Sequence, residues 1–392
     1  MARAQANPNV SVLVWARESA GLSLEAAAKK AGVSKERLEA WESEQEESQK
    51  PTFAQLRTLA VAYKRPLAVF YLPEPPKRFE AMHDFRRKAG AGGIQTPELT
   101  LEIRRAHDRR EWAIELFEEI EEAPPVINES ISIQQDSESA AEIVRKLLRV
   151  TLPDQRRWTT DYEAFREWRA RIEEAGILTF QATGVDSEEA RGFSIGERPL
   201  PVAVANIKDA PRGRIFTLLH EVAHILLRES GVCDLHESEE DAPSRIEAFC
   251  NRVAGAALFP GDALLNTSVV RAHPKAEMVW SDAELQQISR QFGGSREAAL
   301  VRLLGLGLTT QAVYDQKSAE FKELYAQQKL KQKGGFVPPH ELAITSAGPT
   351  FTSLVIESFG RERITASDVS DYLQVRLKHL PTIQRDFTKF ST

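Results

Sequence analysis

Two histidines and a glutamate stand within five consecutive residues, His220-Glu221-Val222-Ala223-His224. The stretch from Arg214 to Leu227 around them is predicted to form one helix. Residues four apart lie on one face of a helix, so His220 and His224 can hold a single metal ion from the same side. Glu221 is offset by one position and can point at a water molecule on that metal. The chemistry predicted is metal-assisted hydrolysis, in which the carboxylate takes a proton from the polarised water.

This spacing is the HExxH pattern of zinc peptidases, in which two imidazoles bind Zn²⁺. The alternative is an ordinary helix with two hydrogen-bonded histidines, since the pattern also occurs by chance. The surrounding sequence favours the metal, because the flanking residues are apolar nearly all round and predict a buried helix. Buried ionisable groups need partners, and a metal ion would satisfy all three. We therefore expect one zinc ion per chain.

A catalytic zinc ion usually has three protein ligands and a water molecule, so a third ligand is expected elsewhere. The segment from Ser244 to Pro260 is predicted to be a second apolar helix, and it carries Glu247 and Asn251 four residues apart. Glu247 is the best candidate for the third ligand. Asn251 could hydrogen-bond one of the ligands from behind. The alternative for Glu247 is a carboxylate that the helix dipole favours near a helix N-terminus.

Three other residues near these helices could also bind a metal. Cys250 could bind a soft metal, but it lies one position off the face of Glu247 and is predicted to be a small buried hydrophobe. Cys233 and His236 stand in the loop between the two helices. Both are predicted to be ordinary polar loop residues.

The two segments together resemble the ImmA/IrrE metallopeptidases, whose pattern is HExxH, then ExxxN, then a helix of small residues that ends in proline. The resemblance is specific over residues 160 to 310. It implies that Glu221 is the general base. It also implies that zinc is bound by His220, His224 and Glu247.

Short strands are predicted at 177–181, 192–195 and 202–206, after several helices and before the HExxH helix. This order is expected for a zincin-like α+β domain. We expect the whole chain to be mainly α with a small β-sheet, with an all-α N-terminal domain and a helical C-terminal region. The resemblance further implies that the segment 201–207 is the edge strand of the active site, along which a peptide substrate would lie extended.

The N-terminal segment predicts a helix-turn-helix. A helix from Leu24 is ended by Gly32, and Ser34 can cap a second helix from Lys35 to Glu42. The sequence around them resembles the XRE/Cro repressor type. The segment 65–76 resembles the junction seen where such a domain precedes an ImmA/IrrE peptidase.

The charge of this domain leaves its role open between DNA binding and protein docking. Residues 11–72 contain nine basic and eight acidic groups, a net charge of +1, whereas phosphate contacts supply most non-specific DNA affinity. Glu36 and Glu39 on the presumed recognition helix would repel phosphates, although carboxylates can pair with cytosine. Only Lys35 and Arg37 are candidates for DNA contacts. XRE-type modules often pair on two-fold sites, so a homodimer is compatible with the sequence.

Composition predicts a cytoplasmic protein with no membrane association. The chain has 392 residues, which is room for two or three domains, and a net charge of −6. Two cysteines exclude a disulfide framework. There is no run of eighteen apolar residues and no apolar secretion signal at the N-terminus.

Four regions are expected: a helix-turn-helix domain (1–76), a linker and charged helix (77–125), the metallopeptidase domain (126–310) and a helical C-terminal region (311–392). Within the third, residues 288–304 predict another helix, glycine turn and helix. This unit could be a second DNA reader, but packing under the metal site is favoured. Residues 364–379 predict a capped helix whose role the sequence does not reveal.

Three functions follow from these expectations. The first is a zinc endopeptidase that cleaves a regulatory protein, such as a repressor or antitoxin-like partner, in stress response or mobile-element control. The second is a DNA-binding transcriptional regulator whose zinc fold serves as a sensor or scaffold. The third is an antitoxin-like interaction protein. The sequence does not identify the substrate or an oxyanion-stabilising residue.

Overall fold

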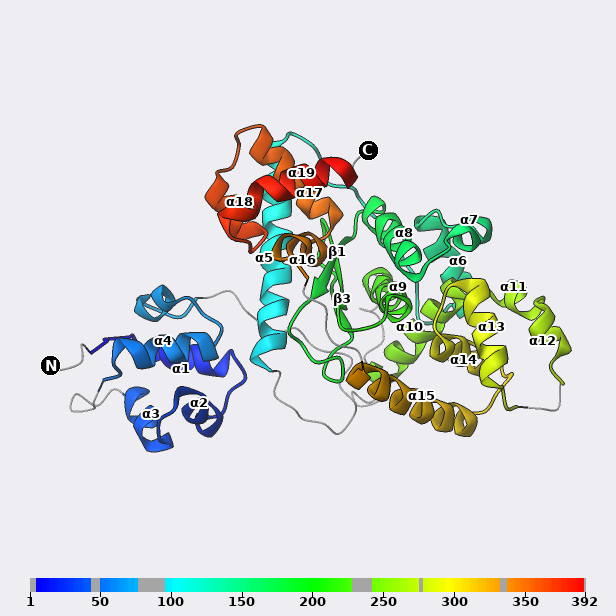
Figure 1. Ribbon diagram of the computed structural model, residues 1–392, viewed down its shortest axis with the longest axis horizontal. Helices are drawn as coiled ribbons and strands as arrows, with labels where there is room; N and C mark the ends of the chain where they lie inside the picture. The colour runs from blue at the N-terminus through cyan, green and yellow to red at the C-terminus, as the bar shows by residue number, and fades with distance from the viewer. Residues whose placement is uncertain are drawn as a thin grey trace. The chain divides into compact units, whose positions relative to one another are not determined.

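The computed structural model describes residues 5–43, 50–76, 96–227, 242–274, 278–331 and 337–390 (Figure 1). The chain divides into two compact units, Met1–Arg105 and Ala106–Thr392, and the division falls inside one long helix, α5. The predicted linker around residues 77–95 and the loop with Cys233 and His236 lie outside the described residues. Among the described residues, no helix is long and apolar enough to span a membrane.

The first unit has the predicted helix-turn-helix. Its elements are α1 (Val10–Glu18), α2 (Leu24–Ala31), α3 (Lys35–Trp41), α4 (Phe53–Ala62) and the 3-10 helix η1 (Leu67–Tyr71), followed by α5 (Pro97–Glu119). Gly32 ends α2 in the left-handed region at φ 67°, and the Ser34 side chain accepts a hydrogen bond from the Arg37 amide at the start of α3. A glycine C-cap and a serine N-cap, both recognisable in the sequence, therefore determine the turn.

A small core and one ion pair hold this unit together. Leu13, Leu38 and Leu56 are fully buried in the core. The Arg17 guanidinium donates to both carboxylate oxygens of Glu42 at 2.9 Å, with both side chains largely buried. This contact ties the end of α1 to the end of α3.

The second unit is helical around one small sheet. Its elements are α6 (Ser137–Leu147), α7 (Leu152–Arg157), α8 (Asp161–Glu174), β1 (Leu178–Ala182), β2 (Gly192–Ile195), β3 (Val202–Asn206), α9 (Pro211–Leu227), α10 (Ala242–Leu258), α11 (Gly261–Leu265), α12 (Ser268–Ala272), α13 (Asp282–Phe292), α14 (Arg296–Gly305), α15 (Gln311–Lys331), α16 (Pro339–Ala347), α17 (Pro349–Gly360), α18 (Ala366–Tyr372), η2 (Leu377–His379) and α19 (Leu380–Phe390).

The sheet corrects one expectation. Its strand order is β1-β3-β2, with β1 parallel to β3 and β2 antiparallel to it. The segment 201–207 therefore contains the central strand, and its assignment as the edge strand was wrong. Every residue of β3 is buried, as expected of a strand with a neighbour on each side. Among the described strands, β2 is the outer one on that side.

The two predicted site helices form the centre of the main hydrophobic core. Helices α9 and α10 pack side by side (Figure 1). Helix α9 is buried nearly all round, and α10 contributes small residues to the same core, such as Ala254 and Ala257. Helix α14 packs against α10 and buries Ala299 and Leu300. The helix pair at 288–304 is therefore part of this core and packs against α10, as the structural interpretation expects.

The C-terminal helices differ from the prediction at one point. Helix α18 ends at Tyr372 instead of continuing to residue 379. Gln374 adopts a left-handed conformation at φ 54°, and the Val375 amide bonds back to the Ser370 carbonyl, which closes the helix. The chain then turns into η2 and α19.

Candidate metal centre

Helix α9 presents both histidines on one face, as the four-residue spacing predicts. The Nε2 atoms of His220 and His224 lie 2.9 Å apart, and the two ring centroids are 4.7 Å apart. His220 is 1% exposed, and the His224 side chain is 13% exposed. The two rings therefore converge on one point at the edge of the core.

Helix α10 brings Glu247 to the same point. Its Oε2 lies 3.3 Å from Nε2 of His220, and its Oε1 lies 3.1 Å from Nε2 of His224. Within the described part of the chain, these three residues are the one cluster of histidine, cysteine or carboxylate side chains that could hold a metal ion. The structure thus brings together two residues of α9 and one residue of α10.

The spacing of these ligand atoms fits a tetrahedral ion. Ligand atoms at about 2.0–2.1 Å from zinc, at tetrahedral angles, lie roughly 3.3 Å from one another. The separations here are 2.9, 3.1 and 3.3 Å. Two imidazole nitrogens and a carboxylate oxygen are also the donor types that zinc binds in hydrolytic sites.

The environment keeps Glu247 ionised. Burial alone raises the pKa of this carboxyl, but the hydrogen bonds and charge interactions with His220 and His224 outweigh burial and hold its pKa well below the ordinary value. An anionic carboxylate at neutral pH is the form that binds a cation.

Glu221 lies next to the cluster without belonging to it. The residue is 2% exposed, and one of its carboxylate oxygens, Oε1, faces the start of β2. A Cβ atom at Gly192 would lie 3.3 Å from this oxygen, 2.3 Å from the Val204 carbonyl oxygen and 2.4 Å from Cγ2 of Thr217. Only glycine fits at this contact between β2 and α9, and sequence analysis did not identify it.

Two further candidate residues, Cys250 and Asn251, lie on α10 in different environments. Asn251 is half-buried on α10, one turn beyond Glu247. Cys250 is fully buried in the hydrophobic core, as predicted, and is not among the clustered ligands.

Two arginines that sequence analysis did not single out fix the start of α9. Arg212 donates to the Asp161 carboxylate at 2.8 Å and to the Ser289 hydroxyl at 2.6 Å. Arg214 is buried and donates to the side-chain oxygen of Gln181 on β1. Basic residues at a helix N-terminus oppose the helix dipole, so their presence in this first turn was a usable signal for tertiary contacts.

In the first unit, the two candidate DNA contacts are both exposed on α3. The Lys35 ammonium pairs with Glu25, which raises the pKa of the lysine. The Arg37 guanidinium lies 5.7 Å from the centroid of the Trp41 ring. Lys35 is thus partly neutralised within the domain, and Arg37 carries the less compensated charge.

The comparisons with known proteins match both units. Residues 172–304 match the peptidase family model described as the IrrE N-terminal-like domain, and residues 13–70 match the helix-turn-helix model. Neither the curated proteins nor the solved structures give a significant match. The first match contains the three clustered residues, and the second contains α2 and α3. The chain therefore has the ImmA/IrrE-type architecture, in which an XRE-type helix-turn-helix domain accompanies a domain of the metallopeptidase type.

Proposed function

We propose that this protein is a zinc-dependent endopeptidase that cleaves a regulatory protein, such as a repressor or antitoxin-like partner. The observation that carries the proposal is the convergence of His220, His224 and Glu247 beside a separate buried carboxylate, Glu221. In this proposal the first three residues hold one zinc ion. Asn251 supports this ligand set from α10.

The proposed chemistry divides between the ion and the chain. A bound zinc ion lowers the pKa of its water ligand and polarises the scissile carbonyl. The Glu221 carboxylate takes one proton from the water as its oxygen bonds to the carbonyl carbon. Glu221 then gives that proton to the amide nitrogen as the C–N bond breaks, which returns the carboxylate to its starting state. Burial of Glu221 keeps bulk water away from this proton transfer.

The corrected strand order changes where the substrate is expected to lie. An extended peptide can add to a sheet only at a free strand edge, and β3 has a neighbour on both sides. We expect the substrate to pair along β2, where a Cβ atom at its first residue, Gly192, would lie 3.3 Å from Oε1 of Glu221. A photocrosslinking amino acid at Phe193 should capture the substrate protein in the Glu221→Gln background. The same probe at the exposed Tyr162 on α8 is the control.

Metal analysis tests the proposed site directly. Purified wild type should contain about one zinc per chain, and His220→Ala and Glu247→Ala should each lose it. His340→Ala, a half-buried histidine on α16, is the matched control and should keep the metal. A wild type that binds no zinc after reconstitution would overturn the proposal.

Cleavage is tested with a second variant. Glu221→Gln should keep zinc because Glu221 is not among the three clustered ligands, and it should lose cleavage of the partner protein by about a hundredfold or more. Equal cleavage by this variant and wild type would exclude Glu221 as the base. Because such a peptidase can be confined to one partner, the substrate should come from a comparison of cellular proteins with and without the active enzyme.

The helix-turn-helix domain supports a second role, in regulation through DNA. The match over residues 13–70 and the exposed position of α3 favour it. We expect Arg37→Ala to weaken DNA binding across sequences and reduce the salt-dependence slope by about one charge. Lys35→Ala should have a smaller effect because Lys35 pairs with Glu25. If neither variant changes DNA binding, protein docking, including pairing into a homodimer, is the better role for this domain.

A further inference from the structure

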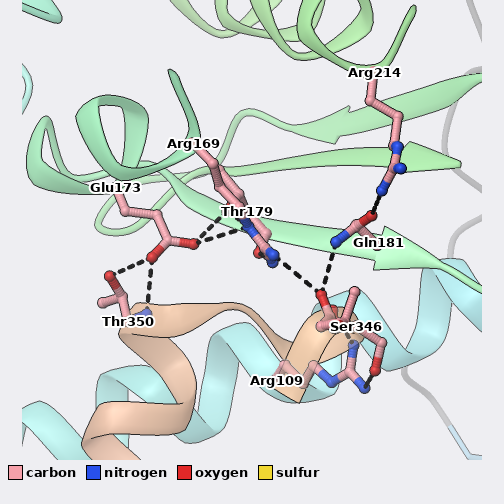
Figure 2. Close-up of polar contacts among 9 residues, drawn as sticks. Arg109, Arg169, Glu173, Thr179, Gln181, Arg214, Ser346 and Thr350 are labelled. Atoms are coloured by element: carbon pink, nitrogen blue, oxygen red, sulfur yellow. Dashed lines mark hydrogen bonds and ion pairs between the residues drawn. The ribbon is translucent and has the colours of Figure 1, made fainter. Parts of the chain in front are cut away.

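The junction between α16 and α17 is held in a buried polar socket on β1 and α8 (Figure 2). We define the junction as residues 345–350 and the socket as Arg169, Glu173, Thr179 and Gln181. All four socket residues are at most 7% exposed. The carbonyl oxygen of Thr345 accepts hydrogen bonds from Arg169 at 3.1 Å and from the Gln181 side chain at 3.0 Å.

The other end of the junction completes the socket. The Glu173 carboxylate accepts hydrogen bonds from the backbone amide of Thr350 at 2.8 Å and from its hydroxyl at 2.6 Å. These contacts satisfy a free amide at the N-terminus of α17. Buried charges such as Arg169 and Glu173 are costly without full hydrogen bonding. The socket is therefore complete only when the junction is docked.

The junction also fits the socket sterically, because there is no room for a side chain at Gly348. Gly348 has a φ of 87°, and a Cβ atom there would lie 2.4 Å from the Thr179 carbonyl oxygen and 2.9 Å from Nη2 of Arg169. A side chain at this position would push the junction away from β1. The close approach also brings Phe351 edge-on against Phe180, at 6.1 Å between ring centroids.

One residue of the socket, Gln181, also contacts α9, the helix that carries His220 and His224. The side-chain nitrogen of Gln181 donates to Thr345, while its oxygen accepts from Arg214 of α9 (Figure 2). Arg214 lies six residues before His220 on the same helix. Because the amide uses its donor on one side and its acceptor on the other, its orientation is fixed only when both partners are present.

We infer that Gln181 is a positioning residue that couples docking of the C-terminal helices, residues 337–390, to the placement of α9. The significance of this coupling rests on the proposed function, since α9 carries His220, Glu221 and His224. A junction held in its socket orients Gln181, Gln181 holds Arg214, and Arg214 holds the N-terminal turns of α9 against the sheet. Release of the junction loosens the helix that carries the ligands.

Hydrogen exchange of the full-length, metal-free protein tests this coupling. In Gln181→Met, which has a similar volume and neither hydrogen bond, amides 215–222 should exchange about tenfold faster than in wild type. Gly348→Val displaces the junction without changing Gln181 or Arg214, and it should accelerate exchange in the same segment. Gln181→Glu removes the donor to Thr345, but either carboxylate oxygen can accept from Arg214 without being oriented by the junction. This variant should therefore uncouple the two ends: α9 stays protected while the start of α17 exchanges faster.

Val369→Ala is the matched control, since Val369 is fully buried in α18 and has no part in the socket. It should accelerate exchange in α18 and leave α9 unchanged. The inference is overturned if amides 215–222 exchange equally in wild type and Gln181→Met, or if Val369→Ala accelerates them as much. Zinc content of the wild type is measured separately, so a failure of the coupling and a failure of the proposed function give different results.

Discussion

A single methyl group at Gly192 should damage both the stability of the second unit and the catalysis proposed for it. The methyl of Gly192→Ala would lie 2.3 Å from the Val204 carbonyl oxygen and 2.4 Å from Cγ2 of Thr217. The first neighbour is backbone of the central strand and cannot rotate away. Overpacking of this kind costs about 1–3 kcal/mol, and we expect the upper half of that range because both contacts fall far inside van der Waals distance.

The catalytic effect follows from the third neighbour. The same methyl would lie 3.3 Å from Oε1 of Glu221, so relief of the clash must move either β2 or Glu221, the proposed base. Misplacement of a general base by about 1 Å costs on the order of a hundredfold in rate. Zinc content should not change, because the three atoms nearest to the added methyl belong to none of the clustered residues.

Gly213→Ala is the matched control for this prediction. Gly213 lies in the first turn of α9, and its Cβ would meet only Asp209 at 3.8 Å, an ordinary contact. Alanine there should leave stability unchanged or increase it by up to about 1 kcal/mol through helix propensity. The assay is chemical denaturation with tryptophan fluorescence, together with zinc content and cleavage rate. If Gly192→Ala is as stable and active as Gly213→Ala, the packing of β2 against α9 is wrong.

Three further perturbations have defined outcomes. Removing zinc with a chelator should lower the free energy of unfolding of the second unit by about 4 kcal/mol relative to protein at a free zinc concentration of roughly a thousand times Kd; equal stability with and without zinc would contradict the site. Arg302→Met removes the hydrogen bond to the Phe259 carbonyl at 2.8 Å and the ion pair with Glu138, and should cost about 2–3 kcal/mol, whereas Arg157→Met, at a side chain 76% exposed, should cost less than about 0.5 kcal/mol. Burial raises the pKa of Tyr63, whose buried hydroxyl has no hydrogen-bond partner, so the first unit should lose stability as pH rises above the unfolded value of about 10. Tyr63→Phe should remove that alkaline loss without destabilising the unit at neutral pH; a loss of more than about 1 kcal/mol at pH 7 would show that the hydroxyl is bonded.

The histidine pair of the candidate metal cluster could be predicted because its geometry depends on local spacing. A spacing of four residues places His220 and His224 on one helical face wherever that helix lies in the fold. Glu247 was predicted from a second apolar helix and from the resemblance to the ImmA/IrrE pattern, since local spacing alone does not show that α10 meets α9. The buried position of Cys250 was predicted because it lies on an apolar helix, one position off the face of Glu247.

Features that depend on non-local pairing were not predictable from these patterns. Strand order is one example, since the alternation and composition of residues 201–207 do not reveal that β2 pairs outside them. Gly192 is another, because its constraint comes from atoms of β3 and α9. The end of α18 at Tyr372 depends on a left-handed Gln374, a residue type with no strong preference for that conformation.

The shortness of β2 limits what its outer edge can do. An exposed strand edge is a template for any chain, and long flat edges lead to self-association. With four residues, β2 offers too few backbone groups to hold another β2 by backbone pairing alone, since isolated two-stranded pairing is marginal in water. A peptide that remains on this edge therefore needs an additional source of affinity. Under the proposed function, contacts beyond the strand, rather than the sequence at the cut, would decide which proteins are cleaved. The same short edge would protect the molecule from aggregating with its own copies.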